Sequence, residues 1–262
     1  MLRIQTQACA LYLLAVLCTA QPVANSTVME ATLDDLRSRF PNQLVFGFEE
    51  LWDERGNQDI NLGSPDSTLQ QLLQRARVTN PRYKIDLRSD GLVHLYPARG
   101  TADPAHLLDI RLREFRLPPD HCIQWAIENL DRGSEPGSEL VRGPLSYAPE
   151  LSKFVREKKK EWYLKQGRHE PVVGGFMGGG LGSCDPVGSH PDTYSSRMYH
   201  NITVRDAMNL MAVRSLKLSR KEVQSDDPQY GGRGEPISWK FRFRRDPDAD
   251  SGLGGVPVFQ TF

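Results

Sequence analysis

Ser183 is the residue of this 262-residue chain whose setting is most like that of a nucleophile, because it follows a glycine-rich run from Gly174 to Gly182. A catalytic serine needs a base within hydrogen-bonding reach and a turn that exposes its hydroxyl group. The Gly-x-Ser-x-Gly motif that builds such a turn is absent, since Leu181 stands at its first glycine position. We therefore expect no catalytic residues and no enzyme activity. A secreted hydrolase with a site near this run is the alternative.

The same glycine run could be considered for phosphate binding, because backbone N–H groups without side chains can surround an anion. A phosphate-binding loop ends in Gly-Lys-Ser/Thr and lies directly between a strand and a helix. This run has neither feature. We interpret the whole stretch from Gly133 to Asp192 as a long insertion whose glycine-rich core is a flexible loop or lid.

Four residues with metal-binding side chains lie in or near this insertion: His169, Cys184, His190 and His200. Structural zinc sites usually pair their ligands roughly two to five residues apart. No two of these residues are spaced so closely. Scattered loop histidines are the simpler interpretation, and we expect neither a metal nor a cofactor.

Two pairs of adjacent acids, Glu49-Glu50 and Asp226-Asp227, are the remaining candidates for acid–base chemistry. Adjacent side chains on a strand point to opposite faces of the sheet, so they cannot act on one substrate atom. We expect these carboxylates to point apart or to be solvated.

The first 20 residues have the composition of a secretory signal peptide: a basic residue, Arg3, an apolar run from Ala8 to Cys18, and small residues before Gln21. Leu17 precedes Cys18 where a lipoprotein signal would have a small residue, so lipid attachment is the weaker interpretation. The run is shorter than the ~20 residues that span a bilayer. The sequence therefore predicts an exported protein, periplasmic or extracellular, without a membrane span after signal removal.

Without the predicted signal peptide, two cysteines are left, Cys122 and Cys184, and the formal charge is −1. A balanced charge offers no bulk attraction to nucleic acid. An oxidising compartment permits a disulfide between the two cysteines. Alternatively, Cys122 is a small buried side chain on the helix that it shares with Ile123 and Ala126. The sequence leaves this choice open.

Aromatic side chains are the best candidates for contact with a partner, because rigid amphipathic rings bury a large area at low entropic cost. Trp239 alternates with Ile237 and Phe241 and is expected in the core. Trp162 and Tyr163 lie near the end of a lysine-rich helix predicted from about residue 149 to residue 165. We expect this pair to form a partner-contact patch.

Periodicity predicts an α+β fold with two small βα sheet units and a long glycine-rich insertion. The N-terminal unit, residues 21–104, reads as βαββ, with a hairpin through Asp90-Gly91. The second unit, residues 105–262, reads as a split βα…βαβ that contains the insertion 133–192. Its predicted elements are a bulged strand from Leu108, a helix over 123–130, a strand over 194–199, a helix over 202–215 capped by Asn201, and strands over 237–243 and 256–259.

Residues 60–97 and 194–243 share one pattern, in which a polar residue with Ser or Thr opens a helix that an alternating strand follows. The matching motifs are Ser67-Thr68-Leu69-Gln70-Gln71-Leu72-Leu73 and Asn201-Ile202-Thr203-Val204-Arg205-Asp206-Ala207-Met208. This pattern resembles the secretin/TonB short N-terminal domain, and Leu108 to Leu130 is similar to the opening βα half of that family. The resemblance implies a βα sheet module of the bacterial cell envelope that binds an envelope protein or associates with itself, without chemistry of its own. The insertion departs from the family pattern.

Overall fold

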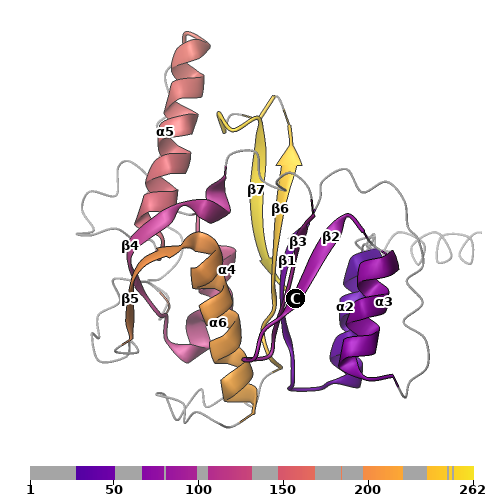
Figure 1. Cartoon of the computed structure of the whole chain (residues 1–262). Coiled ribbons are helices and arrows are strands. Elements are labelled where there is room, and N and C mark those ends of the chain that lie inside the picture. Colours follow the sequence, from indigo (N-terminus) through magenta and orange to yellow (C-terminus); the bar gives the residue numbers. More distant parts are fainter. Residues whose placement is uncertain are drawn as a thin grey trace, which may run out of the picture.

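The computed structural model describes residues 28–50, 67–79, 81–98, 106–131, 147–168, 184, 197–220, 235–246, 248–249 and 251–262. Within these ranges the chain is an α+β protein, as the periodicity predicts, with five α-helices, a mixed five-stranded sheet and a separate two-stranded antiparallel pair (Figure 1). The predicted signal peptide and the glycine-rich run lie outside the described residues.

The elements are labelled as in Figure 1. The helices are α2 (Val28–Arg39), α3 (Leu69–Thr79), α4 (Ile123–Glu128), α5 (Pro149–Lys165) and α6 (Val204–Ser219), with short 3-10 turns η1 (Leu107–Asp109) and η2 (Asp120–Cys122). The strands are β1 (Val45–Glu50), β2 (Tyr83–Leu87), β3 (Leu92–Pro97), β4 (Arg111–Arg116), β5 (Met198–Thr203), β6 (Trp239–Arg245) and β7 (Gly255–Thr261).

The large sheet joins strands that the sequence assigned to two units. Its order is β2-β3-β1-β6-β7, with β1 parallel to both β3 and β6 and with antiparallel pairs at both ends. The expectation that residues 21–104 and 105–262 each build a sheet of their own is therefore corrected: β6 and β7 join the sheet of the N-terminal strands, and β4 and β5 form a separate pair. The physical reason is that β1 is buried along its whole length, so it needs a strand on each side. The predicted edge strand at the C-terminus is confirmed as β7.

Helices cover the sheet on both faces (Figure 1). The side chains of β1 alternate between them: Phe46 and Phe48 pack with α2 and α3, whereas Val45 packs with α4 and α6. The apolar residues of α6 recur at helical spacing and are fully buried: Val204, Ala207, Met208, Met211, Ala212 and Leu216. The sheet thus separates two hydrophobic cores, one on each face.

The start of α6 differs by a few residues from the prediction. Strand β5 continues to Thr203, whose side chain accepts a hydrogen bond from the Asp206 backbone while the Asp206 carboxylate accepts one from the Thr203 backbone. This capping box satisfies backbone donors that the first helical turn leaves free. The predicted cap, Asn201, instead lies within β5 with φ 53°, a left-handed conformation that asparagine tolerates better than most residues.

The predicted bulged strand from Leu108 is also corrected. His106 has φ 55° and begins the turn η1, which buries both Leu107 and Leu108 before β4 starts at Arg111. Two successive apolar side chains on one side are incompatible with strand alternation, and the 3-10 turn accommodates both.

Gly47 marks the closest approach between the sheet and α6. A Cβ atom there would lie 2.7 Å from the Trp239 ring and 3.0 Å from Oδ1 of Asn209. These two side chains are buried and joined by a 3.0 Å hydrogen bond from the Trp239 indole N–H. There is consequently no space for a methyl group at this position.

We expect Gly47→Ala to lower the free energy of unfolding by about 1–3 kcal/mol, because added volume in a packed core forces neighbours off their preferred rotamers. Urea denaturation of the two proteins measures the difference. In a Trp239→Phe background the smaller ring makes room, so the same substitution should cost less. An equal cost in both backgrounds would show that the indole ring is not the obstacle.

In the parts of the chain that the structure describes, no helix combines the length and the apolar character needed to cross a membrane.

Candidate functional site

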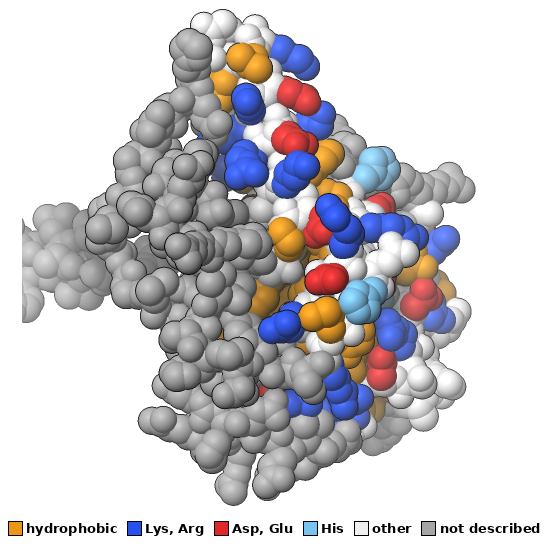
Figure 2. Space-filling model, turned by 90° about the vertical axis from the view of Figure 1, so that its left-hand side faces the viewer, with side chains coloured by type: hydrophobic (Ala, Val, Ile, Leu, Met, Phe, Trp, Pro, Cys, Tyr) orange, Lys and Arg blue, Asp and Glu red, His pale blue; other side chains and the backbone are white. Residues whose placement is uncertain are grey.

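Helix α5 carries Trp162 and Tyr163, the two residues that the sequence analysis expects to contact a partner. It begins with Pro149, which suits the first helical position, and runs to Lys165, as predicted. Its first turn is anchored by buried Leu151, and its far end extends away from the body of the molecule (Figures 1 and 2).

The two aromatic residues of the predicted patch differ in exposure. Tyr163 is buried, whereas Trp162 is half-buried and stands edge-on to it with ring centroids 5.0 Å apart. Gly252 in the β6–β7 turn lies against the backbone of Lys158 and the Cβ atom of Trp162. Tyr163 therefore packs inside the protein, whereas its neighbour Leu164 is an apolar residue that is 62% exposed.

We call the outward side of α5 the α5 patch: Lys158, Lys159, Lys160, Trp162, Leu164 and Lys165. Phe154 and Val155, by contrast, are half-buried and pack against the core. The helix as a whole has six basic and three acidic residues, a formal charge of +3, in a chain of zero formal charge. Two of the acids pair with lysines of the same helix, Glu157 with Lys153 and Glu161 with Lys158. Figure 2 shows blue basic side chains gathered on this projection.

A second cluster forms around Glu49, on the face of the sheet covered by α6. The side chain of Glu49 is 5% exposed and lies 3.0 Å from Nε2 of His94 on β3. Arg205, in the first turn of α6, binds Glu49 through Nε and Nη2 and binds Asp109 through Nη1. His94 also packs against the Trp239 ring, with centroids 5.7 Å apart.

The charges of this cluster support one another. Burial alone would raise the pKa of Glu49, but hydrogen bonds from His94 and Arg205 outweigh burial and hold that pKa below its ordinary value. Burial would lower the pKa of Arg205, and its contacts with Glu49 and Asp109 raise it instead. A carboxylate held by a guanidinium and an imidazole is a charge-assisted crosslink between sheet and helix. The cluster fixes the position of α6.

Glu50 makes a comparable contact on the opposite face, where its carboxylate accepts two hydrogen bonds from Arg242 at 2.6 and 2.7 Å. The adjacent acids thus point apart, as predicted. They are not solvated, because both residues are only 4% exposed. The cation that pairs with each acid lies far away in sequence, Arg205 for Glu49 and Arg242 for Glu50. No local sequence pattern therefore predicts these ion pairs.

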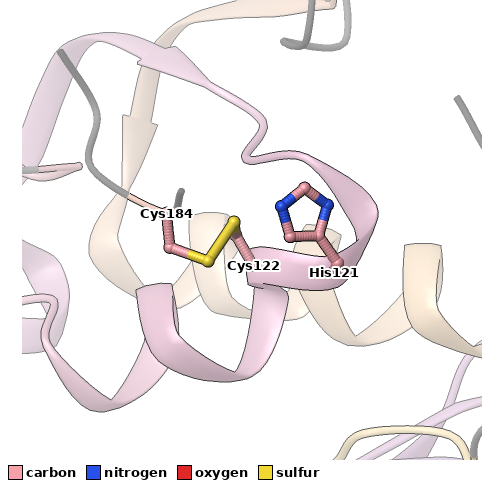
Figure 3. Close-up of side chains that lie close together, drawn as sticks. All are labelled: His121, Cys122 and Cys184. Atoms are coloured by element: carbon pink, nitrogen blue, oxygen red, sulfur yellow. A yellow bond between two sulfur atoms is a disulfide. The ribbon is translucent and has the colours of Figure 1, made fainter. Parts of the chain in front are cut away.

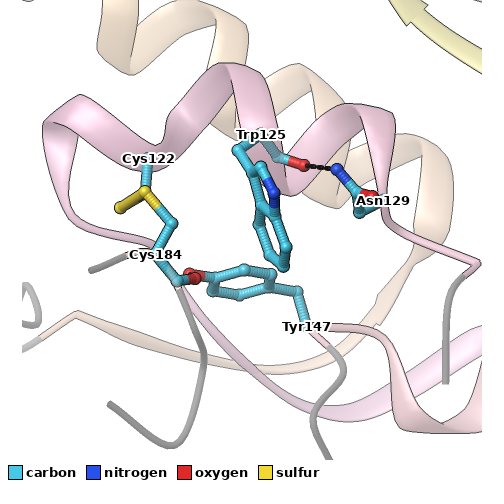
Figure 4. Close-up of a disulfide and its surroundings, with 5 residues drawn as sticks. All are labelled: Cys122, Trp125, Asn129, Tyr147 and Cys184. Carbon is cyan, nitrogen blue, oxygen red and sulfur yellow. Dashed lines mark hydrogen bonds between the residues drawn. A yellow bond between two sulfur atoms is a disulfide. The ribbon is translucent and has the colours of Figure 1, made fainter. Parts of the chain in front are cut away.

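A third arrangement surrounds the two cysteines (Figure 4). Cys122 and Cys184 are joined by a disulfide, with their Cα atoms 5.2 Å apart, within the range that disulfides require. The Tyr147 hydroxyl donates a 2.6 Å hydrogen bond to the carbonyl oxygen of Cys184, and the Tyr147 ring stands edge-on to Trp125. The disulfide and the contacts of Tyr147 therefore hold Cys184 beside the start of α4.

His121 stands beside this disulfide (Figure 3). A ring nitrogen of His121 and the two sulfur atoms all lie within 4.8 Å of one another. The sequence interpretation overlooked His121, although its signal was the adjacent pair His121-Cys122. Of the histidines considered for a metal, His200 is exposed on β5, away from this group, and His169 and His190 lie outside the described residues.

Ser183, the glycine-rich run and the acids Asp226 and Asp227 also lie outside the described residues. Trp239 is fully buried, as predicted.

Comparison with known proteins identifies no relative: no family model, no curated protein and no solved structure matches this chain.

Proposed function

We propose that this chain is an exported, non-catalytic protein-interaction module of the secretin/TonB short N-terminal type. A repeated order of elements supports this proposal: α3 is followed by the antiparallel strand pair β2–β3, and α6 is followed by the antiparallel strand pair β6–β7. The two copies differ in the strand before the helix: β1 belongs to the large sheet, whereas β5 pairs with β4 outside it. The two copies therefore share the helix and the strand pair that follows it, and they differ in the sheet to which the preceding strand belongs.

The observation that carries the interaction role is the α5 patch. Most long helices of a globular protein bury an apolar stripe along their length. In α5 the first turns follow this rule, because Leu151, Phe154 and Val155 pack with the core. In the last turns Tyr163 is buried, but Trp162 is half-buried and Leu164 is exposed. Tryptophan is one of the residue types enriched among the residues that dominate binding at protein interfaces, so Trp162 is the anchor of the proposed contact.

The charge of α5 selects the chemistry of the partner. A local charge of +3 in a neutral chain attracts an acidic surface and repels a basic one. We therefore infer that the partner is an envelope protein that presents acidic side chains around an apolar pocket. Association driven by these charges weakens with salt, because ions screen exposed charges beyond about 10 Å at 0.1 M.

Site-specific photo-crosslinking in the producing cell tests this proposal. A photoreactive residue replaces Leu164 in the full chain, and in a control protein it replaces Val78 on α3, which is 71% exposed. We expect a discrete crosslinked adduct from position 164 and none from position 78. The double charge reversal Lys159→Glu/Lys160→Glu should reduce the yield at position 164 without altering expression.

Equal adducts from both positions would indicate random collision and would contradict the proposal. So would an adduct at position 164 that persists unchanged after charge reversal, since the partner would then not be acidic. A crosslinked dimer of this chain would replace the envelope partner with self-association.

A further inference from the structure

We infer that His121, Cys122 and Cys184 form a Zn²⁺ site when the Cys122–Cys184 disulfide is reduced. The three ligand atoms already lie within 4.8 Å of one another (Figure 3). Two thiolates and one imidazole are ligands that Zn²⁺ accepts, with a water molecule in the fourth position of an open site. This inference is independent of the proposed partner.

The movement needed to bind the ion is small. Bond lengths of about 2.3 Å for Zn–S and 2.0 Å for Zn–N place the two sulfur atoms of a tetrahedral site about 3.8 Å apart, and each sulfur about 3.5 Å from the nitrogen. Two sulfur atoms bonded at about 2.05 Å in a disulfide must therefore separate by about 1.7 Å, which side-chain rotation provides. Cys122 is buried while His121 and Cys184 are half-buried, so water can reach the fourth position from the surface.

The backbone of both sides of the site is held by contacts that do not depend on the disulfide. Asp120, directly before His121, accepts two hydrogen bonds from Arg214 of α6 at 2.8 and 2.9 Å, and both side chains are less than a tenth exposed. On the other side, the Tyr147 hydroxyl holds the Cys184 carbonyl. Reduction therefore leaves the ligands near one another, and ion binding need not gather them from a disordered chain.

A dithiol is the reductant that opens the Cys122–Cys184 disulfide. The dithiol gives two electrons and two protons to the disulfide and becomes a disulfide itself, which leaves two thiols on the protein. Binding of Zn²⁺ then releases the two thiol protons to solvent, because only thiolates coordinate. The disulfide and the metal are thus alternative crosslinks at one place in the fold.

Zn²⁺ titration of the purified chain tests the inference. The protein is reduced with dithiothreitol, desalted without oxygen, and titrated with Zn²⁺ against a chromophoric chelator. We expect about one ion per chain in the reduced protein and none in the oxidised protein. His121→Ala should weaken binding about 100-fold or more, because loss of even an outer-shell partner of a zinc ligand costs 10- to 100-fold. His200→Ala, which removes an exposed histidine elsewhere, is the matched control and should bind like the unaltered chain.

Circular dichroism recorded at each step separates a folded site from loose thiols. If the reduced chain unfolds, Zn²⁺ should restore its spectrum, and His121→Ala should need more Zn²⁺ for the same recovery. Binding that is unaffected by His121→Ala overturns the inference, whether the chain is folded or not. So does the absence of stoichiometric binding after reduction, or equal binding by the oxidised protein.

Discussion

Replacing both cysteines, Cys122→Ala/Cys184→Ala, is expected to lower the free energy of unfolding by about 4 kcal/mol. The disulfide joins residues 62 positions apart, and a crosslink that closes a loop of this length removes about that much chain entropy from the unfolded state. Most domains have a total stability of only about 5–15 kcal/mol, so the loss is large. Guanidinium denaturation of the variant and of the unaltered chain, both oxidised, measures it.

The loss should not be uniform, because the 62-residue loop contains all of α5. Hydrogen exchange should show lower protection in α5, whereas β1 and β3 at the centre of the sheet should change only with global stability. As a control, dithiothreitol should destabilise the unaltered chain by a similar amount and leave the double variant unchanged. A double variant that unfolds at the same denaturant concentration as the unaltered chain would contradict the prediction.

Local signals predicted most of the elements. Helix α5 has the bounds expected from its proline start and the spacing of its apolar residues, since both signals act within a few turns. The β2–β3 hairpin follows from Asp90-Gly91 for the same reason: Gly91 has φ 89°, which a tight turn requires. Such features need no knowledge of distant parts of the chain.

The way the sheet is assembled could not be predicted in this manner. Gly47 of β1 pairs with Trp239 of β6, across most of the chain, and parallel pairing carries no turn between the strands that would announce it. The order of helix followed by strand occurs twice along the chain, and this repetition suggested two modules. Periodicity records which face of an element is apolar, and it does not record which strand lies beside it.

The candidate sites also differ in whether their residues are close together in the sequence. Trp162 and the lysines of α5 were visible as a composition on one helix, whereas Arg205 and Glu49 lie 156 positions apart and meet only in the folded chain. Asn201 and Thr203 show the intermediate case, in which both residue types suit a helix cap and only the backbone decides between them.

The second large effect on stability is expected at the ion pair between Arg205 and Glu49. Arg205→Met should lower the free energy of unfolding by about 3–5 kcal/mol at pH 7, because it leaves the buried carboxylate of Glu49 without its guanidinium and with His94 as its remaining partner. Adding Glu49→Gln in the same chain should recover a substantial part, since no buried charge then remains. Arg113→Met is the matched control: this arginine is 92% exposed beside Glu150, and surface ion pairs contribute about 0–1 kcal/mol.

The dependence on pH distinguishes a buried charge from lost packing. In the unaltered chain the pKa of Glu49 is held below its ordinary value, so the stabilisation is present above the unfolded pKa and is lost as the pH falls through the folded pKa. In Arg205→Met the pKa of Glu49 is higher than in the unaltered chain, because only His94 then opposes burial, so the variant gains relative stability as the pH falls and Glu49 is protonated. The difference in unfolding free energy between the two proteins should therefore shrink from pH 7 towards about pH 4. A difference that stays constant over this range would mean that Arg205 acts through packing alone, and that the Glu49 cluster does not hold α6 to the sheet by charge.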